Sequence, residues 1–266
     1  MPELPDVETF RRTLDHHGLG RPVRRTTVSA PDLLADISPQ SLGRLLKNHP
    51  LAETRRHGKV LFAAREGRDG WLVLHFGMSG SLVMLEGRDA PPEHAGLVIA
   101  FDLGGFAYVS PRRLGMIGWT QSPEAFVASR GLGPDALAVD RERFVPDLRG
   151  HRGAIKCWLM DQARLAGIGN VYSDEILFHA GIHPKRAGNT LDEPEAKRLY
   201  EAMRRVLEQA VAARADPARL PDGYLLPRRE KGGRCPRCGE ALATARACGR
   251  TAWYCPGCQA PDEVSH

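Results

Sequence analysis

The chain has 266 residues, with 37 lysines and arginines against 32 acidic residues, a formal charge of +5 and a pI near 9.0. Apolar residues make up 42% and charged residues 26%, which is typical of a folded globular protein and argues against a disordered one. The absence of a run of about 18 apolar residues argues against a transmembrane helix, and the acids and prolines at the start argue against a secretory signal. The positive charge favours an anionic partner such as nucleic acid, although many basic surfaces bind nothing.

The first predicted element is a helix over residues 5–17, in which Val7, Phe10 and Leu14 recur at helical spacing before Gly18. From Pro22 to about residue 120 the pattern changes to short β-rich runs separated by glycine, proline and charged turns. These runs are PVRRTTVSA, KVLFAA, WLVLHF, SLVML, GLVIAFDL and FAYVS. Several short strands at this spacing predict a sandwich or a flattened barrel.

Residues 128–140 contain closely spaced glycine and proline, which is typical of a linker, and the chain beyond them is helical in pattern. The clearest helical segments are AIKCWLMDQ, VYSDEILFHAG and PEAKRLYEAMRRVLEQAVAARA. In the last of these, one face is apolar and is formed by Leu199, Met203, Val206 and Ala210. A basic connection over 216–233 then leads to a cysteine-rich end. The order of elements predicts an α+β protein with more than one domain.

Two C-x-x-C pairs lie near the end of the chain, Cys235 with Cys238 and Cys255 with Cys258, and sixteen residues separate them. Each pair can aim two sulfurs at one point, and a hairpin between the pairs would complete a tetrahedral zinc site. Because the protein would supply all four ligands, we expect one structural zinc ion; a disulfide or redox role for the pairs is the alternative. The remaining cysteines, Cys157 and Cys248, are predicted to be free thiols without a metal.

Three further segments have features suited to a nucleic-acid backbone. Arg246 and Arg250 are expected on or near the tip of the zinc hairpin, where guanidinium groups can pair with phosphate, although solvated surface arginines are the simpler interpretation. Asn170 follows glycines directly before a predicted helix, where backbone N–H groups can bind an anion, but most such turns only connect helices. Met78, in the turn HFGMSGSL, either packs into the core or fills the gap that an extracted base leaves in a duplex.

The N-terminus places Pro2 beside Glu3, Asp6 and further acids. If Met1 is removed, Pro2 becomes a secondary amine at the end of the chain, next to carboxylates that can manage its protons. A terminal amine has a reference pKa of roughly 8, so much of it is uncharged near neutral pH, whereas a lysine amine, at roughly 10.4, would need a large shift. Lys59, in the turn RRHGKVLF, is on this reasoning more often a solubilising charge than a catalyst.

In order and spacing, these segments resemble the formamidopyrimidine-DNA glycosylase family of bifunctional repair enzymes. The resemblance covers nearly the whole chain and rests on PELPDVE, GKVLF, HFGMSGSL, PRRLG, IKCWLMDQ, GIGNVYSDEILFHAGIHP and the final cysteine pairs. It implies an N-terminal catalytic β-sandwich with a leading helix over 1–128, a linker over 129–140, a helix-two-turn-helix domain over 141–228 and a zinc finger over 229–266. It further implies a cytoplasmic, nucleoid-associated monomer without a membrane partner, acting on double-stranded DNA that contains damaged bases or abasic sites.

By the same resemblance, Pro2 is the nucleophile that attacks C1′ of the damaged nucleoside and forms a Schiff base, after which β- and δ-elimination cut the strand. Glu3 matches the general acid–base residue, and Lys59 matches a lysine that contacts the damaged nucleotide and a neighbouring phosphate. The residues that match DNA-contacting positions are Met78, Arg112, Leu114, Lys156, Asn170 and Arg250.

Three features depart from the family's pattern. Asp6 stands where the family commonly has glutamate, so a carboxylate that orients the active-site backbone is one methylene shorter. Leu114 replaces a phenylalanine of the set that fills the duplex, and the stretch before Cys235 looks shorter than in members that cap 8-oxoguanine with a loop. The expected substrates are 8-oxoguanine and formamidopyrimidines. The alternatives are an endonuclease VIII-like enzyme for oxidised pyrimidines and a non-catalytic zinc-ribbon protein that binds lesions.

Overall fold

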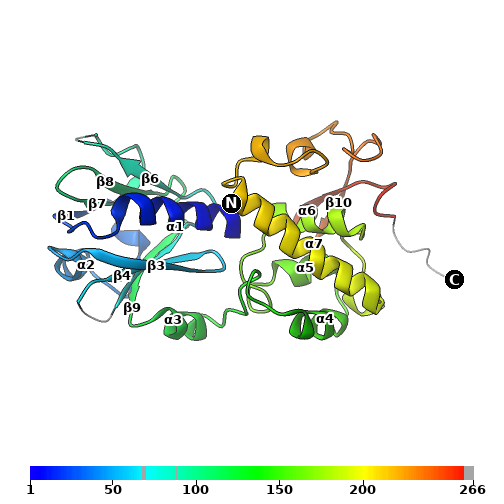
Figure 1. Ribbon diagram of the computed structural model, residues 1–266, viewed down its shortest axis with the longest axis horizontal. Helices are drawn as coiled ribbons and strands as arrows, with labels where there is room; N and C mark the ends of the chain where they lie inside the picture. Colours follow the sequence, from blue (N-terminus) through cyan, green and yellow to red (C-terminus); the bar gives the residue numbers. More distant parts are fainter. Residues whose placement is uncertain (68–69, 88, 261–266) are drawn as a thin grey trace. The chain divides into compact units, whose positions relative to one another are not determined.

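The computed structural model describes residues 1–67, 70–87 and 89–260 (Figure 1). The chain divides into two compact units, Met1–Gly131 and Leu132–His266. The first contains most of the strands and the second most of the helices, which confirms the predicted α+β class. Within the described ranges, no helix combines the length and the apolar character needed to cross a membrane.

Two sheets and a leading helix form the first unit. One sheet has the strand order β1-β7-β8-β6 and the other β2-β9-β5-β4-β3, and every strand pair is antiparallel except β2 with β9. Apolar side chains of both sheets meet in one core, which confirms the predicted sandwich. The strands are β1 (Arg25–Val28), β2 (Leu34–Ala35), β3 (Leu51–His57), β4 (Val60–Arg65), β5 (Trp71–His75), β6 (Ser81–Leu85), β7 (Ala95–Ala100), β8 (Gly105–Val109) and β9 (Met116–Thr120).

The leading helix α1 (Leu4–Gly18) occupies the predicted position and buries Val7 and Leu14 completely in the core of the first unit. Two further helices, α2 (Pro39–Leu46) and α3 (Pro123–Ser129), were not predicted. Each begins with a serine whose hydroxyl accepts a backbone N–H of the first turn, followed by a proline that suits this position. A short 3-10 turn (Pro31–Leu33) precedes β2.

The second unit is helical and ends in a β-hairpin. The apolar face predicted for α7 is confirmed, since its four residues are at most 1% exposed. Most residues of α6 are buried, because α5, α7 and the hairpin strand β11 pack against it. The elements are α4 (Arg141–Arg149), α5 (Ile155–Met160), α6 (Asn170–Ala180), α7 (Glu193–Ala212), three 3-10 turns (Gly188–Thr190, Pro217–Arg219 and Leu226–Arg228), β10 (Ala243–Ala247) and β11 (Arg250–Tyr254).

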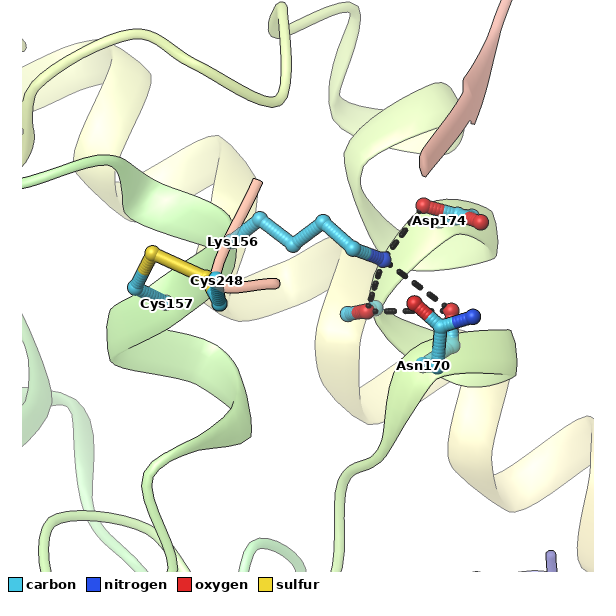
Figure 2. The surroundings of a disulfide bond; sticks show 6 residues. Lys156, Cys157, Asn170, Asp174 and Cys248 are labelled. Atoms are coloured by element: carbon cyan, nitrogen blue, oxygen red, sulfur yellow. Dashed lines mark hydrogen bonds and ion pairs between the residues drawn. A yellow bond between two sulfur atoms is a disulfide. The ribbon is translucent and has the colours of Figure 1, made fainter. Parts of the chain in front are cut away.

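The prediction that Cys157 and Cys248 are free thiols is wrong, because the two residues form a disulfide (Figure 2). Cys157 lies on α5 and Cys248 in the turn of the β10–β11 hairpin, 91 positions further along the chain. Folding brings their Cα atoms to 5.5 Å, within the range that a disulfide bridges. Neither residue has a neighbouring cysteine in the sequence to mark the pairing, so only the packed structure reveals it.

A cluster of charges attaches α1 to strand β3. The carboxylate of Glu8 accepts hydrogen bonds from Arg11 and Arg12 on α1, each at 2.9 Å, and lies 3.4 Å from Nε of Arg56 on β3. Burial acts to raise the pKa of Glu8, but the hydrogen bonds from both α1 arginines and the charge of Arg56 outweigh it and lower the pKa to about 2. The charged form of Glu8 therefore stabilises the folded first unit.

We predict that Glu8→Gln lowers the free energy of unfolding at pH 7 by about 2 kcal/mol. Since the folded pKa of about 2 lies below the ordinary 4.5, the contribution of Glu8 is complete above pH 4.5 and is lost as the pH falls toward 2. The variant should therefore lose less stability than the wild type across this interval. Urea unfolding at a series of pH values measures both effects. The control is Glu93→Gln, which removes the same charge from an exposed position. Its free energy of unfolding should depend on pH as that of the wild type does.

Candidate active site and metal centre

The first residues of the chain are held in place by the start of α1. The backbone N–H of Glu3 donates to Oδ2 of Asp6 at 2.9 Å, and the carbonyl of Glu3 accepts from the N–H of Val7 at 3.1 Å. The side chain of Glu3 is 1% exposed, whereas Pro2 is half-buried and Met1 is exposed. The shorter carboxylate of Asp6 thus still reaches the backbone of Glu3, and Pro2 is carried on an ordered helix end.

Lys59 shares this site with the two carboxylates. It lies in the turn between β3 and β4, where burial lowers its pKa while the charges of Glu3 and Asp6 act in the opposite direction. Burial has the opposite effect on Asp6 and raises its pKa, although the Glu3 N–H, the terminal amine and Lys59 each act to lower it. The structure therefore brings the chain terminus with Pro2 together with Glu3, Asp6 and Lys59, the residues that the family resemblance implies for the active site.

Arg56 is a site residue that the sequence analysis did not single out. Its Nη1 donates to the carbonyl of Gly58 at 3.0 Å, while its Nε faces Glu8. One guanidinium therefore connects α1 with the turn that carries Lys59. Its position in the run RRHGK was the available sequence signal, but the pattern alone could not show that one of the two arginines turns inward.

His75, at the end of β5, borders the same site. Its Nδ1 accepts the backbone N–H of Gly77 at 3.4 Å. Burial lowers the pKa of His75, and the positive charges of Lys59 and Arg130 lower it further. Both effects favour the neutral form of the imidazole.

The segments that contain Met78, Arg112 and Leu114 form a pair of contacting loops. Gly77 has a φ of +60°, and a Cβ there would lie 2.3 Å from the carbonyl oxygen of Leu114, so only glycine permits this approach. Met78 is half-buried, and Arg112 is exposed. Leu114 is 51% exposed, which is unusual for a large apolar side chain. The two loops thus present two apolar groups and one cation on a closely packed base.

The second unit buries Lys156 completely at the start of α6 (Figure 2). Its Nζ donates to the carbonyl of Asn170 at 3.1 Å, to Oγ of Ser173 at 2.7 Å and to Oδ1 of Asp174 at 2.6 Å. These three acceptors match the three N–H bonds of an ammonium. Lys156 therefore holds the helix start from beneath, while Asn170 is half-buried at its first position.

Asp174 joins this helix start to the hairpin. Its second oxygen accepts from Nε of Arg229 at 2.9 Å and from the backbone N–H of Trp253 on β11 at 3.1 Å. Arg250, the first residue of β11, is exposed beside the hairpin turn, as expected for a tip residue.

The four cysteines of the C-x-x-C pairs converge on one point, with all Sγ atoms within 4.8 Å of one another. The Sγ distances are 3.8 Å for Cys235–Cys258 and 3.4 Å for Cys238–Cys255, close to the roughly 3.8 Å that four thiolates adopt around a tetrahedral ion. Burial acts to raise the pKa of Cys235, but backbone N–H groups of Cys238 and Arg237 outweigh it and lower the pKa to about 7. This donor set fits a single four-coordinate metal ion.

The two units and these sites define an α+β protein with an N-terminal β-sandwich and a helical unit that carries a four-cysteine hairpin. Residues 1–117 match the family model of the formamidopyrimidine-DNA glycosylase N-terminal domain, and residues 131–221 match that of the formamidopyrimidine-DNA glycosylase H2TH domain. The chain belongs to the formamidopyrimidine-DNA glycosylase family.

Individual relatives match over the full length. The formamidopyrimidine-DNA glycosylases of Alkalilimnicola ehrlichii and Gluconobacter oxydans are each 37% identical to this chain, over 97% of it and 100% of their own length. The solved complex between the Lactococcus lactis Fpg and an abasic-site-containing DNA has a TM-score of 0.87 at 28% identity, covering 97% of this chain and 100% of that one. A complex of an inhibited LlFpg with DNA containing N7-benzyl-Fapy-dG also gives 0.87, at 29% identity, over 98% of this chain and 100% of that one.

We predict that the purified chain contains one metal ion per molecule and that Cys238→Ala loses it, because three thiolates leave the coordination incomplete. Loss of the ion should also expose residues 235–258 to proteolysis, since metal binding stabilises a segment too small to fold on its own core. Elemental analysis and limited proteolysis measure these effects. The double variant C157S/C248N, which removes the other two cysteines, should keep the full metal content.

Proposed function

We propose that this protein is a bifunctional DNA glycosylase and AP lyase of base excision repair that removes 8-oxoguanine and formamidopyrimidines. The observation that supports it most strongly is the convergence of the chain terminus, Glu3, Asp6 and Lys59 at one partly buried site. A protein that only binds damaged DNA does not need an amine, two carboxylates and a lysine close together at one site. The family membership and the DNA complexes of its structural relatives agree with this function.

The chemistry starts once Met1 is removed and Pro2 has a free secondary amine. The amine attacks C1′ of the damaged nucleoside, the bond from C1′ to the base breaks, and Glu3 donates a proton to the departing base or to the sugar oxygen. Opening of the sugar ring leaves an iminium ion at C1′, which makes the protons on the adjacent carbon acidic. Removal of one such proton expels the 3′ phosphate, and a second elimination expels the 5′ phosphate. Asp6 holds the backbone of Glu3 during these steps, and Lys59 contacts the damaged nucleotide.

DNA binding is divided between the two units in this proposal. Met78, Arg112 and Leu114 enter the duplex and fill the gap left by the extruded base. Asn170, supported from beneath by Lys156, and Arg250 hold the phosphates. The corresponding domains are the sandwich over 1–128, the helix-two-turn-helix region over 141–228 and the zinc finger over 229–266.

The four cysteines hold one zinc ion in a structural role, because the protein supplies every ligand and leaves no position for substrate. Zinc keeps the base of the hairpin that carries Arg250 in place. We further propose that the protein acts as a monomer in the cytoplasm, in association with the nucleoid.

We predict that borohydride traps a covalent complex between Pro2 and a duplex containing 8-oxoguanine opposite cytosine. Glu3→Gln should slow base release at least 100-fold, the lower range expected for losing a general acid–base group. Peptide mass spectrometry locates the crosslink, and single-turnover kinetics measure base release. The exposed Glu93→Gln serves as the matched control and should keep full activity.

The choice of lesion is tested in the same assay. Trapping on an abasic-site duplex but not on 8-oxoguanine would retain the lyase and reject the purine preference, and faster release of dihydrothymine would assign the enzyme to oxidised pyrimidines. Failure to trap either duplex would contradict the catalytic function and favour a binding protein.

We predict that DNA affinity falls steeply with salt and that Arg250→Ala makes the slope of log association constant against log salt shallower by about 0.9. The reason is that one fewer phosphate is neutralised and one fewer counterion is released. Fluorescence anisotropy with an undamaged and an abasic-analogue duplex should show a similar loss for both. Arg143→Ala, an exposed arginine on α4, removes the same net charge and should leave the slope unchanged.

A further inference from the structure

The Cys157–Cys248 disulfide joins α5 to the turn of the β10–β11 hairpin (Figure 2). On α5, Cys157 directly follows Lys156, whose ammonium points the other way and holds the start of α6. On the hairpin, Cys248 comes two residues before Arg250. The bond therefore fixes the tip that carries Arg250 relative to the helix start that carries Asn170. The effect of this arrangement on DNA binding depends on the function proposed above.

The backbone conformation at Cys248 does not favour cysteine, which indicates that the residue is present because its sulfur forms the disulfide. Ala247 pairs with Arg250 across the hairpin, so Cys248 and Gly249 form a two-residue loop. Both have positive φ values, 53° and 68°, as a type I′ turn requires. Asn, Asp and Gly are the residues that favour the first of these positions, and cysteine has no such advantage. The disulfide explains why a cysteine is found there.

The base of the hairpin is attached to the rest of the second unit without the disulfide. Cys235 and Cys255 pack against Phe178 and Leu225 in an apolar cluster. The N–H of Trp253 also donates to Asp174, and Nε2 of Gln259 donates to the carbonyl of Ile182 at 2.8 Å. These contacts attach the base of the hairpin to the rest of the second unit, and none of them involves the disulfide.

The tip of the hairpin, in contrast, is exposed to solvent beyond Ala247. Arg246, Gly249 and Arg250 are exposed, and a Cβ added to Gly249 would meet no atom within 4 Å among the described residues. Cys157 is half-buried against the helices, while Cys248 is exposed. Opening the disulfide should therefore free the tip and leave the base of the hairpin in place.

We propose that the Cys157–Cys248 pair is a reversible thiol-oxidation site that sets the affinity of the protein for DNA. With the bond closed, Arg250 is ordered before DNA arrives, so binding does not have to order it. With the bond open, Arg250 has to become ordered when DNA binds. The free energy of binding is therefore less favourable, and the complex dissociates faster. DNA lies in compartments where thiol reductants are abundant, so an accessible disulfide can report on oxidising conditions, under which oxidised bases also form.

The reduction requires a dithiol or two molecules of a monothiol. A thiolate of the reductant attacks the exposed sulfur of Cys248, the disulfide breaks, and Cys157 leaves as a thiolate that takes up a proton. A second thiolate of the reductant attacks the reductant's own sulfur in the mixed disulfide, releasing Cys248, which is protonated in turn. Two electrons and two protons pass to the protein, and the reductant becomes a disulfide. The reverse reaction, with a disulfide of a small thiol as oxidant, closes the bond.

The test compares oxidised and phosphine-reduced wild-type protein, both with their full metal content, on a labelled duplex containing a tetrahydrofuran abasic analogue. Anisotropy should show affinity about three- to tenfold weaker for the reduced form, mainly through faster dissociation. The variants C157S and C248N should bind like reduced wild type and should not respond to the reductant. Asparagine suits the turn position, so C248N separates loss of the bond from misfolding of the turn.

Two further measurements complete the test. Hydrogen exchange over residues 243–254 should quicken on reduction at the tip and stay unchanged near Trp253, and the single-turnover cleavage rate at saturating enzyme should be equal in both states. Equal affinity for DNA in the oxidised and reduced states, or equal exchange at the tip, would overturn the thiol-oxidation proposal alone. Absence of DNA binding in both states would overturn it together with the proposed glycosylase function.

Discussion

The start of α1 is the part of the structure on which the proposed chemistry depends. Chain ends usually fray, and a frayed terminal amine has no fixed line of approach to a sugar carbon. Here Asp6 holds the backbone of Glu3. One and a half turns further on, Glu8 and Arg56 attach the helix to β3 and to the turn that carries Lys59. The same arginine therefore sets the position of the terminus and of the lysine.

A single carboxylate has the corresponding role in the second unit. Asp174 is fully buried and faces two cations, Lys156 and Arg229. Burying an unpaired ammonium would cost several kcal/mol, so Lys156 can lie inside only because Asp174 does too. The carboxylate also accepts the N–H of Trp253, so the helix start and the hairpin share one buried anion. In both units, an ion pair with little exposure to solvent joins segments that are far apart in the sequence.

The sequence was most informative where a pattern is local. Helical periodicity located α1 and α7, and the spacing of the C-x-x-C pairs located the four-thiolate cluster, because in each case neighbouring positions determine the geometry. The short helix α2 has too few residues for a period to stand out, although Ser38 before a proline was a usable start signal. Arg56 and the Cys157–Cys248 pair depend on contacts between distant segments. Composition and spacing contain no trace of such contacts.

The stretch before Cys235, whose shortness raised the question of lesion preference, is a fixed connection in its second half. The carboxylate of Glu175 accepts the N–H groups of Leu225 and Leu226 at 2.9 and 2.6 Å, and the side chain of Leu225 is completely buried. A segment held by a buried carboxylate and an apolar anchor cannot move over a base without breaking both. Under the proposed function, selection among oxidised bases would therefore depend more on the sandwich unit, where Met78 and the exposed Leu114 lie on contacting loops, than on closure of a loop from the helical unit.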